Sequence, residues 1–117
     1  MITLRRIYDP GNAEEHYRVL VDRLWPRGIS KEKSGINEWL KEISPSNELR
    51  KWYNHDPAKW EEFKQLYKRE LIGKQDELKR LKQLEIKHGT ITLLYSSTER
   101  TYNNAAALRE FLLHEDI

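Results

Sequence analysis

Residues 18–31 read Arg-Val-Leu-Val-Asp-Arg-Leu-Trp-Pro-Arg-Gly-Ile-Ser-Lys, an apolar segment that runs into a charged turn. Residues 17–24 predict a strand with apolar side chains on both faces, which is typical of a strand covered on both sides in an α/β protein. Pro26 lacks the N–H that a sheet ladder needs, so strand pairing should stop just before it. The strand carries Asp22 and Arg23 near its end, and Arg27 lies in the turn that follows.

Two further segments predict strands, residues 2–8 and residues 90–95. Parallel pairing of the second and third strands is the economical arrangement, because the predicted helices between them can supply the crossover connection. The expected fold is therefore α/β, a single three-layer domain over residues 1–117 with a small, mostly parallel sheet flanked by helices.

Apolar residues at helical spacing predict four helices between the second and third strands. Ser44 and Asp56, each followed by proline, look like N-caps that start the second and third of these helices. Gly73 and Gly89 end the third and fourth, and residues 103–114 predict a last helix. The four apolar stripes are Ile36, Trp39, Leu40 and Ile43, then Leu49, Trp52 and Tyr53, then Trp60, Phe63, Tyr67 and Leu71, and finally Leu78, Leu81 and Leu84.

The composition argues against several classes of chemistry. The 117 residues include 21 basic and 19 acidic side chains, and their mixing along the chain favours a solvated surface over a dedicated nucleic-acid interface. The absence of cysteine excludes disulfides and thiolate catalysis, and no histidines are spaced as metal ligands, so neither a metal site nor a cofactor is expected. Nothing resembles a signal peptide or a membrane span, so we expect a cytoplasmic protein with no membrane contact.

A small-anion site is predicted where the parallel strands end, because ligands of open α/β sheets bind at the carboxyl ends of the strands. Arg23 and Arg27 would hold a phosphate or carboxylate, since the guanidinium fork matches such groups. Ser96, Asn103 and the N–H groups of the last helix would orient the anion. If so, these side chains should line one cavity. The alternative is structural, with Asp22 paired to an arginine and the hydroxyl groups satisfying the backbone.

His55 and Asp22 are the candidates for proton transfer, if the site performs chemistry. As part of the dipeptide His55-Asp56, the histidine is better explained as the residue before an N-cap. A functional role would require His55 to fold back to the edge of the sheet, where it could act as a general acid or base near neutral pH. Ser96 and Ser97 lack a Gly-x-Ser-x-Gly elbow and an identifiable base, so a serine nucleophile is not expected.

Three blocks of sequence resemble the YeaO-like branch of the "domain of unknown function 488" family, and together they span nearly the whole chain. The blocks are residues 18–31, residues 45–57 with Lys59, Trp60 and Phe63, and residues 92–95 with Asn103 and Ala105. The resemblance implies an α/β fold and assigns no reaction. It adds Lys31 and Tyr95 to the candidate ligand-binding residues. The shared polar positions are Asp22, Arg23, Arg27, Lys31, Arg50, His55, Asp56, Tyr95 and Asn103.

The chain departs from that family at two places. Members often carry Ala-Lys where this chain has Ser97-Thr98, and His where it has Asn104. If that lysine and histidine are catalytic in relatives, this chain has lost the activity or kept only binding. Another branch of the family carries cysteines, and because this chain has none, the properties of that branch imply nothing about it.

The function expected from the sequence is binding of a small anionic metabolite, with turnover left open. The alternative is a non-enzymatic module that binds nucleic acid or a protein partner through a basic and aromatic surface. Nucleic acid is the less favoured partner, and the oligomeric state stays open.

Overall fold

The computed structural model describes residues 1–115, which contain one four-stranded sheet. All neighbouring strands are parallel, and β2 pairs with β4 so that Val19 lies opposite Leu93. The predicted parallel pairing of these two strands is therefore confirmed. In the order in which they lie across the sheet, the strands are β1 (Ile2–Arg6), β4 (Ile91–Tyr95), β2 (Arg18–Leu20) and β3 (Glu38–Trp39).

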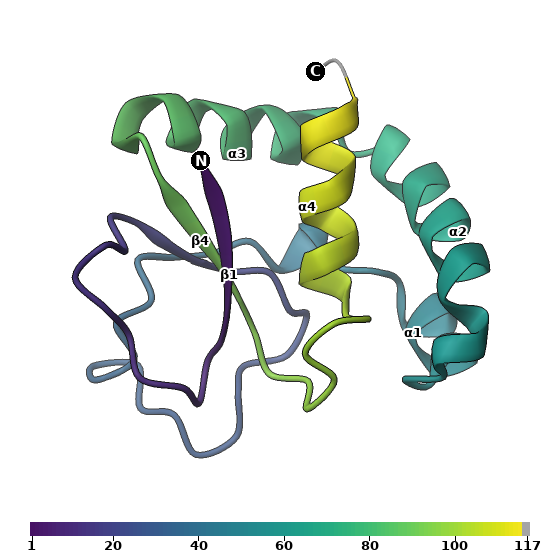
Figure 1. Ribbon diagram of the computed structural model, residues 1–117, viewed down its shortest axis with the longest axis horizontal. Helices are drawn as coiled ribbons and strands as arrows, with labels where there is room; N and C mark the ends of the chain where they lie inside the picture. The colour runs from purple at the N-terminus through teal and green to yellow at the C-terminus, as the bar shows by residue number, and fades with distance from the viewer. Residues whose placement is uncertain (116–117) are drawn as a thin grey trace.

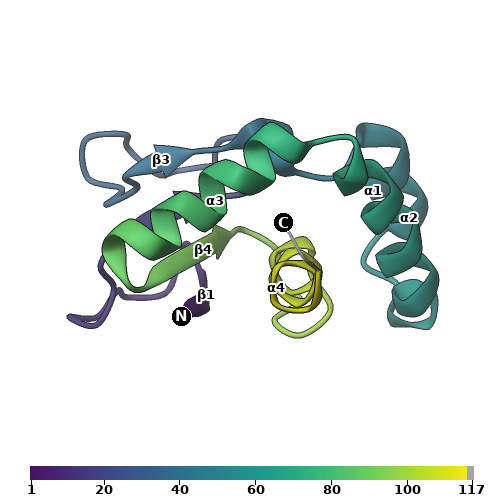
Figure 2. The same ribbon diagram turned by 90° about the horizontal axis from the view of Figure 1, so that it is seen from above.

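Four α-helices pack around this sheet, which confirms the predicted α/β class. Figure 1 shows α4 beside the sheet, α1 and α2 farther away, and α3 running past the end at which β1 and β4 begin; the view in Figure 2 shows α4 end-on. The helices are α1 (Asn47–Tyr53), α2 (Trp60–Ile72), α3 (Gln75–His88) and α4 (Asn104–His114), with short 3-10 turns η1 (Lys41–Ile43) and η2 (Pro57–Lys59).

The two faces of the sheet are covered differently. Successive strand residues point to opposite faces, so Val19 and Leu93 join a large cluster that contains the buried side chains of all four helices. Leu20 and Leu94 point the other way, into a smaller cluster with Ile7. That cluster is covered by Trp25, Ile29, Ile36 and Trp39. The third layer is therefore the connection between β2 and β3, with no helix in it.

The helix predicted from the stripe at residues 36–43 is wrong. Glu38–Trp39 is strand β3, and Lys41–Ile43 is a 3-10 turn. Ile36 and Trp39 pack in the smaller cluster, whereas Leu40 and Ile43 pack with the larger one. The four apolar residues thus serve opposite faces of the sheet, which a single helical stripe cannot do.

The predicted starts and ends of the later elements are largely correct. Asp56 caps η2 by accepting a hydrogen bond from the N–H of Ala58, and Gly73 and Gly89 follow the last residues of α2 and α3. The first helix cap was misplaced, because Ser46, not Ser44, accepts the N–H of Leu49. The first two strands are also shorter than predicted.

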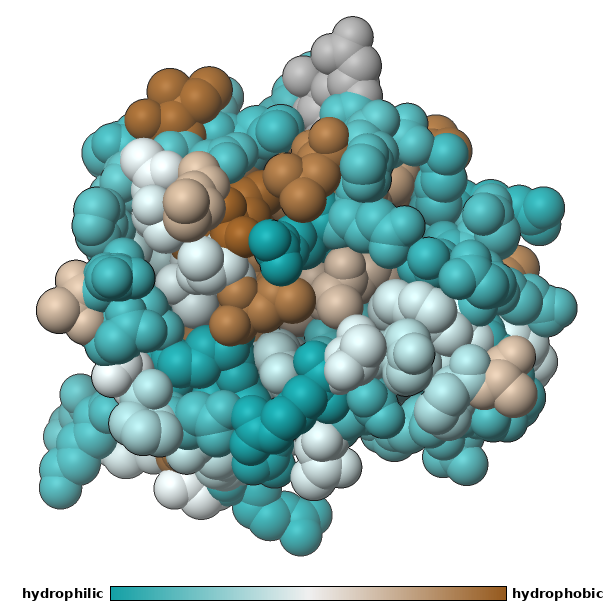
Figure 3. Space-filling model, in the orientation of Figure 1, coloured by the Kyte–Doolittle hydropathy of each residue, from teal (hydrophilic) through white to brown (hydrophobic). Residues whose placement is uncertain are grey.

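The outer surface is mainly polar. Figure 3 shows a largely hydrophilic face on which brown apolar surface gathers near the middle, where β1 and α4 lie in Figure 1. Across residues 1–115, no helix has the length and apolar character that a membrane crossing requires.

Candidate functional site

A cavity of about 510 Å³ lies at the carboxyl ends of β2 and β4. The turn after β2, helix α1, the loop after β4 and the start of α4 all contribute to its lining. Arg23, Arg27, Asp22, Ser96 and Asn103 line this one cavity, together with His55. Parallel pairing explains the arrangement, because it brings both strand ends to the same edge of the sheet.

The charged lining of this cavity is predominantly cationic. Asp22 is the one carboxylate on its walls. Among residues 1–115, no carboxylate forms an ion pair with any of the four arginines that line it. These arginines are Arg6, Arg23, Arg27 and Arg50. Arginines that line one concavity without a carboxylate partner give it a positive potential, which attracts an anion.

Arg23 carries an unsatisfied donor. Its terminal Nη2 donates to the carbonyl of Ser44 at 3.3 Å, but its Nε is buried and has no partner. It is the one buried side-chain nitrogen or oxygen in the described part of the chain that lacks a hydrogen bond. A buried N–H without an acceptor costs free energy, and a small shift of the Arg23 side chain toward a ligand oxygen would remove that cost.

The carboxylate of Asp22 is occupied by bonds within the protein. Oδ2 accepts the backbone N–H and the hydroxyl of Ser96 at 2.9 and 2.7 Å, and Oδ1 accepts the amide of Asn104 at 3.1 Å. The same amide also donates to the carbonyl of Val21 at 3.2 Å. Asp22 therefore ties the end of β2 to the end of β4 and the start of α4. It pairs with none of the arginines that the sequence suggested.

His55 does fold back to the sheet edge. Asn54 and His55 both have positive φ, 46° and 54°, and this left-handed turn after α1 directs the imidazole toward the loop after β4. Its Nδ1 lies 3.3 Å from the hydroxyl of Ser97. Asp56 also caps η2, as predicted, so His55 both precedes a cap and lines the cavity.

Asn103 is the N-cap of α4 and is almost fully buried. Its Oδ1 accepts the N–H of Ala106 at 2.8 Å, and its Nδ2 donates to the carbonyl of Glu99 at 2.9 Å. Both halves of the amide are thus used in holding the loop and helix start. Since Asn103 and Asn104 line the cavity, the positive end of the α4 dipole also faces it.

Lys31 and Tyr95 do not line this cavity. The ammonium group of Lys31 lies 5.7 Å from the centre of the Trp25 ring. Tyr95 is buried in the larger core cluster and lines a different cavity next to β1, and burial raises the pKa of its hydroxyl. Lys31 was a candidate through the family resemblance, and Tyr95 through that resemblance and its place at the end of a strand.

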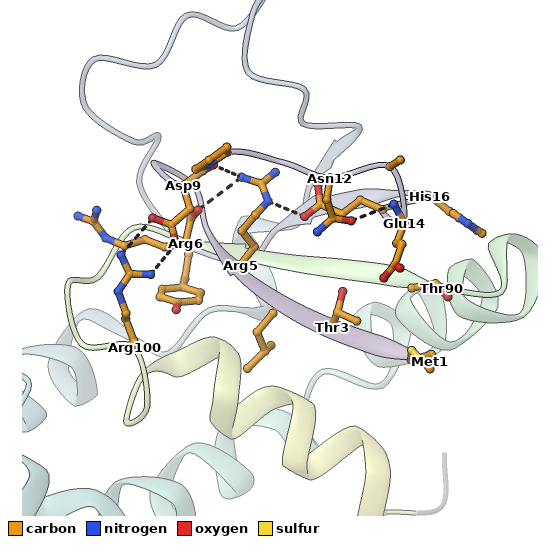
Figure 4. Close-up of a pocket in the computed structure, with 15 residues that line it drawn as sticks. Met1, Thr3, Arg5, Arg6, Asp9, Asn12, Glu14, His16, Thr90 and Arg100 are labelled. Atoms are coloured by element: carbon orange, nitrogen blue, oxygen red, sulfur yellow. Dashed lines mark hydrogen bonds and ion pairs between the residues drawn. The ribbon is translucent and has the colours of Figure 1, made fainter.

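The cavity next to β1, of about 630 Å³, provides an internal comparison (Figure 4). Two of its three arginines form ion pairs, Arg5 with Glu15 and Arg100 with Asp9, and the third, Arg6, lines both cavities. The hydrogen bond from Arg100 lowers the pKa of the Asp9 carboxyl, so this pair stays charged over a wide pH range. Arg5 and Arg100 are therefore neutralised by carboxylates of the protein, whereas Arg23, Arg27 and Arg50, which line only the cavity beside Asp22, form no ion pair with any described residue.

Arg6 was missed by the sequence analysis, and Arg50 was noted only as a position shared with the family. Arg6 ends β1, and its Nε donates to the carbonyl of Ser97 at 3.0 Å. Its guanidinium group also lies 4.7 Å from the centre of the Tyr8 ring. Finding Arg6 required the pairing of β1 with β4, which brings its carboxyl end to the same edge. Within residues 1–115, no group of three or more potential metal-ligating acidic or histidine side chains occurs.

Tyr53 forms part of the wall and gives a testable pH dependence. Burial, and then the nearby Glu99, raises the pKa of its hydroxyl to about 12, and the hydroxyl donates to the carbonyl of Tyr102 at 2.7 Å. The unfolded chain loses this proton near pH 10 and the folded chain near pH 12, so Tyr53 destabilises the fold as pH rises between these values. Urea unfolding from pH 9 to 12 should therefore show a shallower loss of stability for Tyr53→Phe. An unchanged slope would contradict the assignment.

The comparisons with known proteins agree on one family. Residues 1–116 match the family described as "Inactive DUF488-N3 subclade". The chain is 43% identical to the "Uncharacterized protein YeaO" of Escherichia coli (strain K12), over 95% of this chain and 96% of that protein. It is also 41% identical to the "Uncharacterized protein Rv3073c" of Mycobacterium tuberculosis, over 60% of this chain and 59% of that protein. No solved structure matches the chain. The chain belongs to the DUF488 family, in its inactive N3 subclade.

Proposed function

We propose that the protein binds a small anion in the cavity beside Asp22. The observation that carries the proposal is the buried, unpartnered Nε of Arg23, which needs an acceptor. Arg27 and Arg50 add charge from the turn after β2 and from α1, and α4 adds its positive end. A phosphate or carboxylate supplies the negative charge that these groups lack, and acceptor oxygens for the donors that remain free.

We propose binding without turnover. Asp22 already accepts three hydrogen bonds, which suits a structural tie better than proton transfer. At position 104, where the related proteins often carry histidine, this chain has an asparagine that bonds to Asp22. The description of the matched subclade as inactive supports the same conclusion. His55 would then contact the anion or close the rim of the cavity.

Isothermal titration calorimetry with inorganic phosphate tests this proposal. We expect binding at low ionic strength that weakens as salt is added, because exposed and half-exposed charges are screened. Single-stranded and double-stranded DNA of mixed sequence serve as competitors. Displacement of phosphate by either DNA would favour the nucleic-acid alternative, and the absence of any binding heat at low salt would refute the anion site.

A further inference from the structure

We infer that the preferred ligand is a phosphate monoester with an apolar body, and that free phosphate and sugar phosphates bind more weakly. The inference rests on the proposed function and specifies the class of ligand for the same cavity. Four arginines opposite a single, fully bonded carboxylate favour a dianion such as a phosphate monoester. The rest of the ligand is then determined by the uncharged part of the lining.

The uncharged polar side chains on the wall already have hydrogen-bond partners within the protein. Ser96 donates to Asp22, and the amide of Asn103 is bonded at both its nitrogen and its oxygen. The hydroxyl of Tyr53 donates to Tyr102, and that of Ser44 donates to the carbonyl of Lys41 at 2.6 Å. The hydroxyls of a sugar would find acceptor lone pairs on these groups but no free donor, so they would be less well satisfied there than in water.

The remaining wall is apolar and rigid. Two of its residues are prolines, which have no N–H to offer a ligand. Trp25 directs its indole N–H away, to the carbonyl of Ile29 at 2.6 Å. Phe63 is almost fully buried and stacks on Tyr53, so it is fixed in place. The apolar wall consists of Leu24, Trp25, Pro26, Pro45, Tyr53 and Phe63.

The size of the cavity agrees with this chemistry. Its volume of about 510 Å³ is in the range of sites that hold organic ligands, and a phosphate ion would fill only a small part of it. Leu24 is 63% exposed, so an apolar body seated against it would remove hydrophobic surface from water. The phosphate group and the apolar body would thus use different parts of one cavity.

The test compares three ligands by calorimetry at a pH where all are dianions: inorganic phosphate, ribose 5-phosphate and phenyl phosphate. We expect phenyl phosphate to bind about tenfold more tightly than either of the others, from partial burial of the ring. In Leu24→Ala the advantage of phenyl phosphate should fall about threefold, with inorganic phosphate unchanged. Ile72→Ala, which trims an exposed side chain at the end of α2, is the matched control and should change neither.

The possible outcomes distinguish a failure of this inference from a failure of the proposed anion binding. If all three ligands bind equally, or ribose 5-phosphate binds best, the inference is wrong and the anion site stands. If none binds, both are wrong. An equal loss for phenyl phosphate and inorganic phosphate in Leu24→Ala would also overturn the inference, because the residue would then act on the anion.

Discussion

Replacing Arg23 by alanine is expected to weaken the binding of inorganic phosphate about tenfold to a hundredfold, the usual range for a hydrogen bond between charged groups. Arg23 lines the cavity and has no carboxylate partner among the described residues, so a ligand oxygen adds a charge-assisted hydrogen bond that the alanine variant cannot make. The measurement is calorimetric titration at low ionic strength, with the wild-type protein and the variant in the same buffer.

Two further variants make the Arg23 experiment specific. Arg109→Ala removes an exposed arginine of α4 outside the cavity and should leave phosphate affinity unchanged. Arg23→Lys keeps the charge but loses the Nε donor and the planar fork, so it should bind phosphate more weakly than the wild-type protein. Wild-type affinity in Arg23→Lys would mean that charge alone matters and that the buried Nε contributes nothing.

The Arg23 variants should fold, because the residue contributes little to the stability of the protein. Its only hydrogen bond in the described residues is the 3.3 Å contact with the carbonyl of Ser44. The carbonyl of Ser44 also accepts a hydrogen bond from the ammonium group of Lys74 at 3.5 Å, so it still has a hydrogen-bond donor in the variant. The far-ultraviolet circular dichroism of Arg23→Ala should therefore match that of the wild-type protein.

The location of the site could be predicted from the sequence because parallel pairing is a strong geometric constraint. Residues 17–24 and 90–95 are apolar on both faces and have helices between them, which favours two parallel neighbours. Once the strands are parallel, the residues after each strand meet at one edge. Arg27 and Ser96 then come together, although they are far apart in the sequence.

Strand β3 and the other residues of the cavity could not be predicted in the same way, because they depend on contacts between segments that are distant in the sequence. The apolar residues at positions 36, 39, 40 and 43 have the spacing of one helix face. A segment that supplies apolar side chains to both faces of a sheet can show the same spacing, so the pattern alone does not distinguish the two. Pairing with β2, together with the packing of Trp39 against Trp25, makes this segment a strand. The contribution of Arg6 was equally hidden, because it depends on β1 lying next to β4. Nor does the sequence show which candidates line the cavity, since Lys31 and Tyr95 do not.

Replacing Asp22 by alanine is expected to lower the free energy of unfolding by about 3 kcal/mol, because buried donors lose a charged acceptor. The variant would leave the N–H and hydroxyl of Ser96 and the amide of Asn104 without their partner at the junction of β2, β4 and α4. Urea unfolding followed by circular dichroism measures the change.

Glu32→Ala is the matched control for Asp22→Ala, since it removes an exposed carboxylate from the loop between β2 and β3 and should change stability by less than about 0.5 kcal/mol. A structural tie and a proton-transfer group predict opposite results here. Residues kept for chemistry often cost stability, so their removal leaves stability unchanged or raises it. A large loss in Asp22→Ala would therefore favour the structural role and, with it, a site that binds its anion without transforming it.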